Sequence, residues 1–138
     1  GNSTGRADNI KMWSSGSDAL LNFETLSRFS SGVYNDVNTI TIASNTASLD
    51  LNTSNTFKFT AQSTATHILA TNIKAGQVVN IEVTQDVGGA GTITFDPAFK
   101  FPGGTAPTLT ATSNAIDLIS AVSYDGTSLL ANATQNYS

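Results

Sequence analysis

The chain has 138 residues, of which 39% are hydrophobic, a length and composition that suit one domain with a single packed core. Its net charge is −4 and its six basic residues are dispersed, which argues against nucleic acid as a partner because phosphate binding needs a concentrated positive patch. The absence of cysteine excludes disulfides and thiolate metal sites, and no apolar run approaches the roughly 20 residues that span a bilayer, so no membrane insertion is expected.

Hydroxyl and amide side chains take the place of the usual charged surface. Only 12% of the residues are charged, whereas the sequence contains 20 Thr, 16 Ser and 13 Asn. The branched Cβ of Thr suits a pleated strand, and the short side chains of Ser and Asn bond to nearby backbone in turns. The composition therefore predicts an all-β protein.

The first 36 residues contain few β-branched positions and are expected to form a separate N-terminal segment. Residues 10–13 fit a short strand. In residues 18–29 the apolar side chains recur at helical spacing but also alternate as in a strand, and we favour a strand because the rest of the chain is built that way. The chain starts without Met, so we expect it to be a fragment of a longer polypeptide.

Residues 37–138 show the period-two alternation of strands with one buried face. The clearest run is 79–84, where aliphatic residues alternate with Asn80, Glu82 and Thr84. Strands are predicted at 39–42, 48–52, 56–60, 79–84, 92–95, 99–101, 115–122 and 129–133, with a short strand or turn entry at 68–73. Short strands with turn signals between them are typical of sandwiches, so the prediction is an antiparallel β-sandwich, jelly-roll-like in its strand order.

A glycine-rich stretch, Asp-Val-Gly-Gly-Ala-Gly at 86–91, is predicted to be a hairpin connection between the strands at 79–84 and 92–95. It opens no helix, which a phosphate-cradling loop requires. It also lacks the alternating acidic ligands of a calcium loop. A hairpin turn is therefore favoured over ion binding.

An ordered set of short motifs carries a resemblance to a known family. The motifs are IEVTQD at 81–86, TITF at 92–95, FKFPGGTAPTL at 99–109, NAID at 114–117 and YDGT at 124–127. This succession resembles a module that recurs in structural proteins of tailed bacteriophages, in tail fibres, spikes and related receptor-binding parts, and it covers about residues 37–133. The resemblance implies an all-β module in the virion that commonly assembles around a threefold axis, hence a homotrimer. Segment 1–36 lies outside the resemblance and is expected to be a link to an upstream shaft or an adaptor, as short strands or a short helix.

Catalysis is not expected from the titratable residues. The single histidine, His67, has no cluster of further ligands beside it and is interpreted as a strand histidine bonded to a neighbour, although copies meeting at a threefold axis could bind a metal or respond to pH. Asp86 with Asp96, and Asp117 with Asp125, are the only candidate carboxylate pairs for glycoside hydrolysis. Both pairs fit better as turn and strand-end residues. We therefore expect no enzyme activity and no cofactor.

Binding of a glycan suits the polar surface, because sugar hydroxyls exchange hydrogen bonds with Asn, Asp, Ser and Thr while aromatic faces cover the apolar side of the ring. The candidate receptor-binding or glycan-binding residues are Tyr124, Asp125, Asn114, Trp13 and Tyr34. The first three are expected in loops that gather at one end of the sandwich. For the aromatic candidates, ordinary packing or a subunit contact is the alternative.

The sequence thus leads to one expected function and two alternatives. The expected function is a non-enzymatic structural module of an extracellular phage particle, a tail-fibre or spike domain that attaches to a host cell-surface glycan. The first alternative is a capsid decoration or assembly domain that contacts other virion proteins and no receptor. The second, less favoured, is a polysaccharide depolymerase whose site is shared between subunits.

Overall fold

The computed structural model describes residues 32–138, and residues Tyr34–Ser138 form one compact unit. The strands are β1 (Val37–Thr39), β2 (Thr46–Asp50), β3 (Thr56–Thr60), β4 (Ala65–Thr71), β5 (Val78–Thr84), β6 (Thr92–Phe95), β7 (Phe99–Lys100), β8 (Ile116–Val122) and β9 (Leu129–Tyr137). A short 3-10 turn, η1 (Pro102–Gly104), is the only helical element in this part of the chain. The prediction of an all-β protein is confirmed. The segment 10–13 and the ambiguous stretch 18–29 lie outside the described residues.

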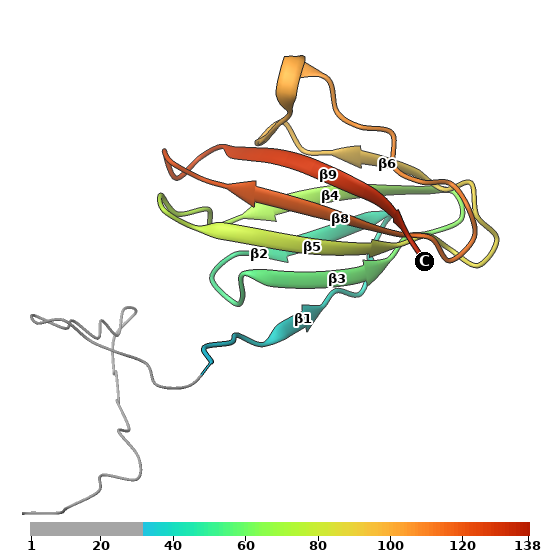
Figure 1. The fold of residues 1–138 in the computed structure, drawn as a ribbon, viewed down its shortest axis with the longest axis horizontal. Helices are drawn as coiled ribbons and strands as arrows, with labels where there is room; N and C mark the ends of the chain where they lie inside the picture. Colours follow the sequence, from blue (N-terminus) through green and yellow to red (C-terminus); the bar gives the residue numbers. More distant parts are fainter. Residues whose placement is uncertain (1–31) are drawn as a thin grey trace, which may run out of the picture. The chain divides into compact units, whose positions relative to one another are not determined.

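The strands form two sheets (Figure 1). Sheet A has six strands in the order β1-β3-β5-β8-β9-β7, and sheet B has three in the order β2-β4-β6. From β1 to β6 the chain enters the two sheets in turn, so that β1, β3 and β5 are parallel neighbours in sheet A and β2, β4 and β6 are parallel neighbours in sheet B. The predicted antiparallel pairing is therefore wrong for the pairings among these six strands. The winding also differs from a jelly roll, whose sheets are antiparallel.

Antiparallel pairing is confined to the middle of sheet A. There β8 pairs antiparallel with both β5 and β9, and β7 then adds to β9 as a parallel edge strand. The connection between β8 and β9 is a local hairpin over residues 123–128. Residues 39–42 were predicted as a strand, but β1 ends at Thr39. Ile40 and Ile42 follow the strand and pack, partly buried, against the core.

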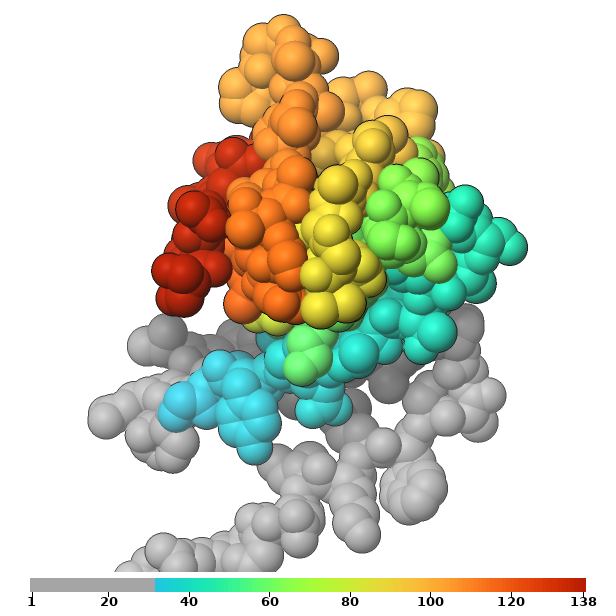
Figure 2. Space-filling view, turned by 90° about the vertical axis from the view of Figure 1, so that its right-hand side faces the viewer, coloured from blue at the N-terminus to red at the C-terminus, as the bar shows by residue number. Residues whose placement is uncertain are grey.

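The glycine-rich stretch 86–91 is not a hairpin, because it carries the chain from β5 in sheet A to β6 in sheet B. Gly91 allows this crossing, since a Cβ there would collide with the backbone oxygen of Gln62. The side chain of Gln85 is buried beneath it and donates through Nε2 to the carbonyls of Gly91 and Thr110, at 3.2 and 3.0 Å. At the end of the molecule that faces the viewer in Figure 2, this stretch lies beside residues 110–114, and the N–H of Ala90 donates to the carbonyl of Ala111.

The inward side chains of both sheets form one hydrophobic core. The largest fully buried apolar residues are Phe57, Val79, Ile81, Val83, Ile119 and Leu129 from sheet A and Leu49 and Ile68 from sheet B. They alternate along each strand with half-buried or exposed residues; in β5, for example, Val79, Ile81 and Val83 are buried and the residues between them are not. This alternation leaves every second residue of β5, β8 and β9 on the outer face of sheet A.

Three phenylalanines fix the segment that follows β6. The ring of Phe95 lies 5.6 Å from that of Phe99 and 4.7 Å from that of Phe101 between centroids, the second pair edge to face. Asp96 closes the turn between them by accepting a hydrogen bond from the N–H of Ala98 at 2.9 Å. Beyond this cluster, η1 stands out from the body of the sheets in both views (Figure 1, Figure 2).

Candidate binding surface

An apolar strip crosses the outer face of sheet A near its β7 edge. Val78, Val122 and Leu130 are direct cross-strand neighbours on β5, β8 and β9, and Lys100 on β7 is the next neighbour of Leu130. Val78 and Leu130 expose 55% and 52% of their surface. Singly exposed aliphatic residues are ordinary on protein surfaces, whereas a contiguous row of them indicates a contact surface.

A row of polar side chains runs beside this strip, displaced from it by two residues on each strand. Asn80, Ser120 and Asn132 are direct neighbours on β5, β8 and β9. The hydroxyl of Ser120 donates a hydrogen bond to Oδ1 of Asn80 at 2.8 Å. On this face, amide and hydroxyl groups are therefore the immediate neighbours of the aliphatic side chains along each strand.

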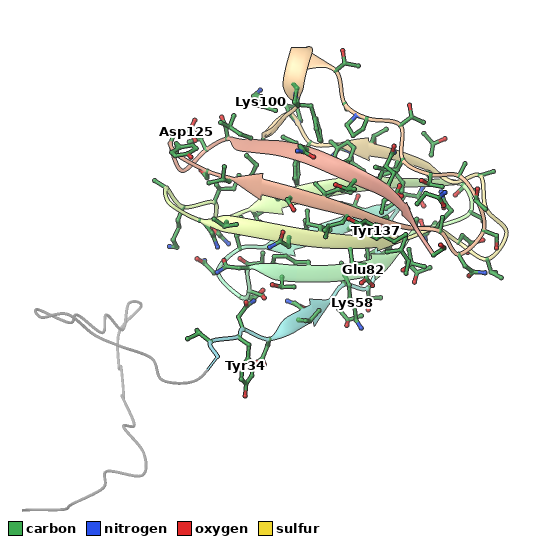
Figure 3. All side chains as sticks on the ribbon, viewed as in Figure 1. Tyr34, Lys58, Glu82, Lys100, Asp125 and Tyr137 are labelled. Atoms are coloured by element: carbon green, nitrogen blue, oxygen red, sulfur yellow. The ribbon has the colours of Figure 1, made fainter. Side chains whose placement is uncertain are left out.

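The strip, the polar row and the start of η1 together line a depression of about 560 Å³, which we call the Lys100 groove. Its lining residues are Val78, Lys100, Phe101, Pro102, Ser120, Ala121, Val122, Leu130, Ala131 and Asn132. The set contains one lysine and no acidic residue. Figure 3 shows Lys100 at the base of η1, at the edge of sheet A away from Lys58.

The rest of the outer face of sheet A carries mixed charge. Lys58 on β3 and Glu82 on β5 are direct parallel neighbours, and Leu118 on β8 continues their row. Both charged side chains are exposed (Figure 3). This half of the face thus has one lysine beside one carboxylate, whereas the groove has a lysine alone.

The residues predicted from sequence are not brought together. Tyr124 and Asp125 lie in the turn between β8 and β9, where Tyr124 is 76% exposed. Asn114 precedes β8, so the seven residues of that strand, roughly 20 Å, separate it from Tyr124 and Asp125. The expectation that these three residues gather at one end is therefore wrong for Asn114. Tyr34 is 90% exposed and precedes β1 at the other edge of sheet A, and Trp13 lies outside the described residues.

Asp125 has a clear role in its own turn. Its Oδ1 accepts hydrogen bonds from the N–H groups of Ser128 at 2.7 Å and Thr127 at 2.8 Å. These two backbone donors hold the pKa of the Asp125 carboxyl well below its usual range, because they stabilise the charged form. The carboxylate therefore stabilises the β8–β9 turn.

The other candidate carboxylates also bind backbone. Asp86 accepts from the N–H of Gly88 at 2.7 Å. Asp117 is buried and accepts from the N–H and the hydroxyl of Thr110, at 2.6 and 2.8 Å, and from the N–H of Asn136 at 2.8 Å. Together with Asp96, these residues occupy turns and strand ends, where an Asp carboxylate accepts hydrogen bonds from nearby backbone N–H groups.

His67 lies on the outer face of sheet B, in β4. Its Nδ1 is 3.0 Å from Oγ1 of Thr94, its direct neighbour on β6. This agrees with the interpretation of a strand histidine bonded to a neighbour. Within residues 32–138 no group of three or more His, Cys, Asp or Glu side chains is placed to hold a metal ion.

Sequence reasoning missed the residues of the Lys100 groove. The alternation in 129–133 places Leu129 and Leu130 on opposite faces of the strand, which indicated that one of these leucines would be exposed. The partners of Leu130 could not be derived, since they depend on the register of β9 against β7 and β8.

Comparison with protein-family models, with curated proteins and with solved structures found no match to this chain. In the part of the chain that the structure describes, no helix is long and apolar enough to cross a membrane.

Proposed function

We propose that this two-sheet, sandwich-like module is a non-enzymatic component of a phage virion, a tail-fibre or spike domain that attaches to a glycan on the host surface. The observation that carries the proposal is the outer face of sheet A, where an aliphatic strip lies directly beside a row of amides and a hydroxyl. Sugars combine the same two features, an apolar ring face and polar hydroxyls. The succession of motifs between residues 81 and 127 supports the phage assignment.

Attachment by such a module depends on several weak contacts made at once. An exposed shallow site binds a single sugar chain weakly, but three copies on one rigid body raise the avidity without any new contact. A homotrimer also covers strand edges that would otherwise pair with other chains. Strands β1 and β2 are such edges in sheets A and B. We therefore propose a homotrimer as the working form of the module.

The test of attachment uses the purified chain on an array of bacterial surface polysaccharides and oligosaccharides. Binding to a subset of these glycans is expected, together with sedimentation of the protein as a trimer. Binding to no glycan at all contradicts the attachment function, and a monomer at high concentration contradicts the trimer. Release of new reducing ends from a bound polysaccharide would instead indicate a depolymerase.

A second candidate function is a decoration or assembly domain that contacts other virion proteins and no receptor. The exposed row of Val78, Val122 and Leu130 favours this alternative, since contiguous aliphatic residues also suit protein contacts. The two functions are distinguished by the array, because an assembly domain binds purified virion proteins but no glycan.

A further inference from the structure

We propose that the Lys100 groove is the subsite for a sugar unit that carries a carboxylate, as in a uronic acid. This inference rests on the proposed glycan-binding function and assigns that function to a place and a ligand class. It also departs from the residues that the sequence suggested, because Tyr124, Asp125 and Asn114 are not part of the groove.

The charge of the groove is the first argument. The described residues contain three lysines and seven acidic residues, yet the groove is lined by Lys100 and by no acidic side chain. Lys58, the other lysine on the outer face of sheet A, has Glu82 as its direct neighbour. The groove is thus lined by an ammonium group and no carboxylate, whereas Asp96 lines the neighbouring depression that Lys100 and Phe101 also border.

The apolar floor is the second argument. Val78, Val122 and Leu130 form a continuous row across three strands, which offers a surface for the C–H face of a sugar ring. Phe101 stands at the side of the groove, and its ring is held by the edge-to-face contact with Phe95 at 4.7 Å. A wall whose position is set by packing loses little conformational freedom when a ligand binds.

The polar rim is the third argument. The amide of Asn132 supplies donors and an acceptor, and it lies in register with Ser120. The hydroxyl hydrogen of Ser120 is donated to Asn80, which leaves the oxygen of Ser120 as an acceptor for a sugar hydroxyl. Lys100 continues the row of Leu130 at the β7 end of the strip, so the cation lies at one end of the aliphatic floor and the amide of Asn132 lies along its side.

The test is titration of the ¹⁵N-labelled full chain with trigalacturonate, followed by NMR spectroscopy. The matched neutral ligand is the methyl ester of the same trisaccharide. We expect trigalacturonate to shift the backbone resonances of Lys100, Leu130 and Asn132, and the methyl ester to bind more weakly. Raising NaCl from about 0.05 M to about 0.5 M should weaken binding of the acid and leave that of the ester unchanged, because salt screens an exposed charge pair.

The variants Lys100→Gln and Asn132→Ala test the groove, and Lys58→Gln is the matched control on the same face. All three substituted positions are exposed, so folding should be preserved. Lys100→Gln should reduce affinity for trigalacturonate about tenfold, as expected for loss of one charged hydrogen bond at a surface. Lys58→Gln should leave the affinity unchanged.

The outcomes separate this inference from the proposed function. Glycan binding on the array that Lys100→Gln and Asn132→Ala leave unchanged overturns the groove assignment and leaves attachment standing. Equal binding of trigalacturonate and its ester, or binding of neutral glycans only, also overturns the groove assignment and leaves attachment standing. Groove resonances that shift with protein concentration alone would identify a contact between copies of the chain and overturn the assignment. If no glycan binds, both proposals fail.

Discussion

The buried carboxylate of Asp117 binds Thr110 twice, accepting from its backbone N–H at 2.6 Å and from its hydroxyl at 2.8 Å. A third bond from the N–H of Asn136 joins the same side chain to the end of β9. One side chain of β8 thus ties the segment that precedes this strand to the strand that follows it.

Replacing Asp117 should destabilise the fold. In Asp117→Asn one carboxylate oxygen becomes an NH2 group, so a donor faces the N–H of either Thr110 or Asn136, which we expect to cost about 2–4 kcal/mol of unfolding free energy. Urea unfolding followed by circular dichroism measures the loss. Glu82→Gln, an exposed strand position, should change stability by less than about 0.5 kcal/mol, and equal effects of the two substitutions would contradict the role of Asp117.

Neighbouring leucines provide a test of the register of β9. Leu129 is completely buried, whereas Leu130 is 52% exposed on the outer face. Leu129→Ala should therefore cost about 2–5 kcal/mol, because it leaves a cavity in the core, and Leu130→Ala should cost less than about 1 kcal/mol. Chemical denaturation of the pair measures both values, and a larger loss at Leu130 would mean that the strand faces the other way.

Gly91→Ala should disturb the crossing from sheet A to sheet B. The added Cβ meets the backbone oxygen of Gln62, which cannot move without displacing the chain between β3 and β4. We expect a loss of about 2–3 kcal/mol, within the range for overpacking, seen as a lower midpoint of thermal unfolding. Gly32→Ala serves as the control, because a Cβ at Gly32 meets nothing within 4 Å, and it should leave the midpoint unchanged.

Asp125 should make stability depend on pH in the acid range. The N–H groups of Ser128 and Thr127 lower the pKa of its carboxyl in the folded state relative to the ordinary value of 3.8. The unfolded chain therefore takes up the proton first as pH falls, and the stabilisation, present above about pH 4, is lost progressively below it. Thermal unfolding between about pH 6 and pH 2 should show a shallower acid decline for Asp125→Asn than for the parent protein. Parallel profiles of the two proteins would contradict this.

The buried faces of the strands could be predicted from sequence, because alternation is a local property. The run at 79–84 is an example, and its inward residues Val79, Ile81 and Val83 are all buried in β5. The direction of pairing was predicted wrongly, because alternation is usual in antiparallel sheets, whereas here the parallel strands β3 and β5 also alternate between buried and more exposed residues. Likewise, the glycines of 86–91 suit a tight turn, but here they allow close approach to Gln62 and Ala111.

The candidate site was less predictable than the fold. The sequence identifies Tyr124 and Asp125 as loop residues, and the β8–β9 turn confirms this placement. The predicted strand at 115–122 already places Asn114 before the strand and Tyr124 after it, so the expectation that all three residues gather at one end did not fit that strand. The Lys100 groove depends on parallel pairing between β7 and β9, which joins segments about 30 residues apart, and no local pattern encodes such a contact.

The alternation of the chain between two sheets has a consequence for how the domain forms. In β1 to β6 every hydrogen-bonded neighbour is reached only after the polypeptide has visited the opposite layer, so each ladder must first close a long loop. The β8–β9 hairpin is free of this requirement, because a short turn joins its two strands, and it is positioned to organise early. A high contact order of this kind gives slow folding, and refolding on the scale of about milliseconds to seconds is its kinetic signature.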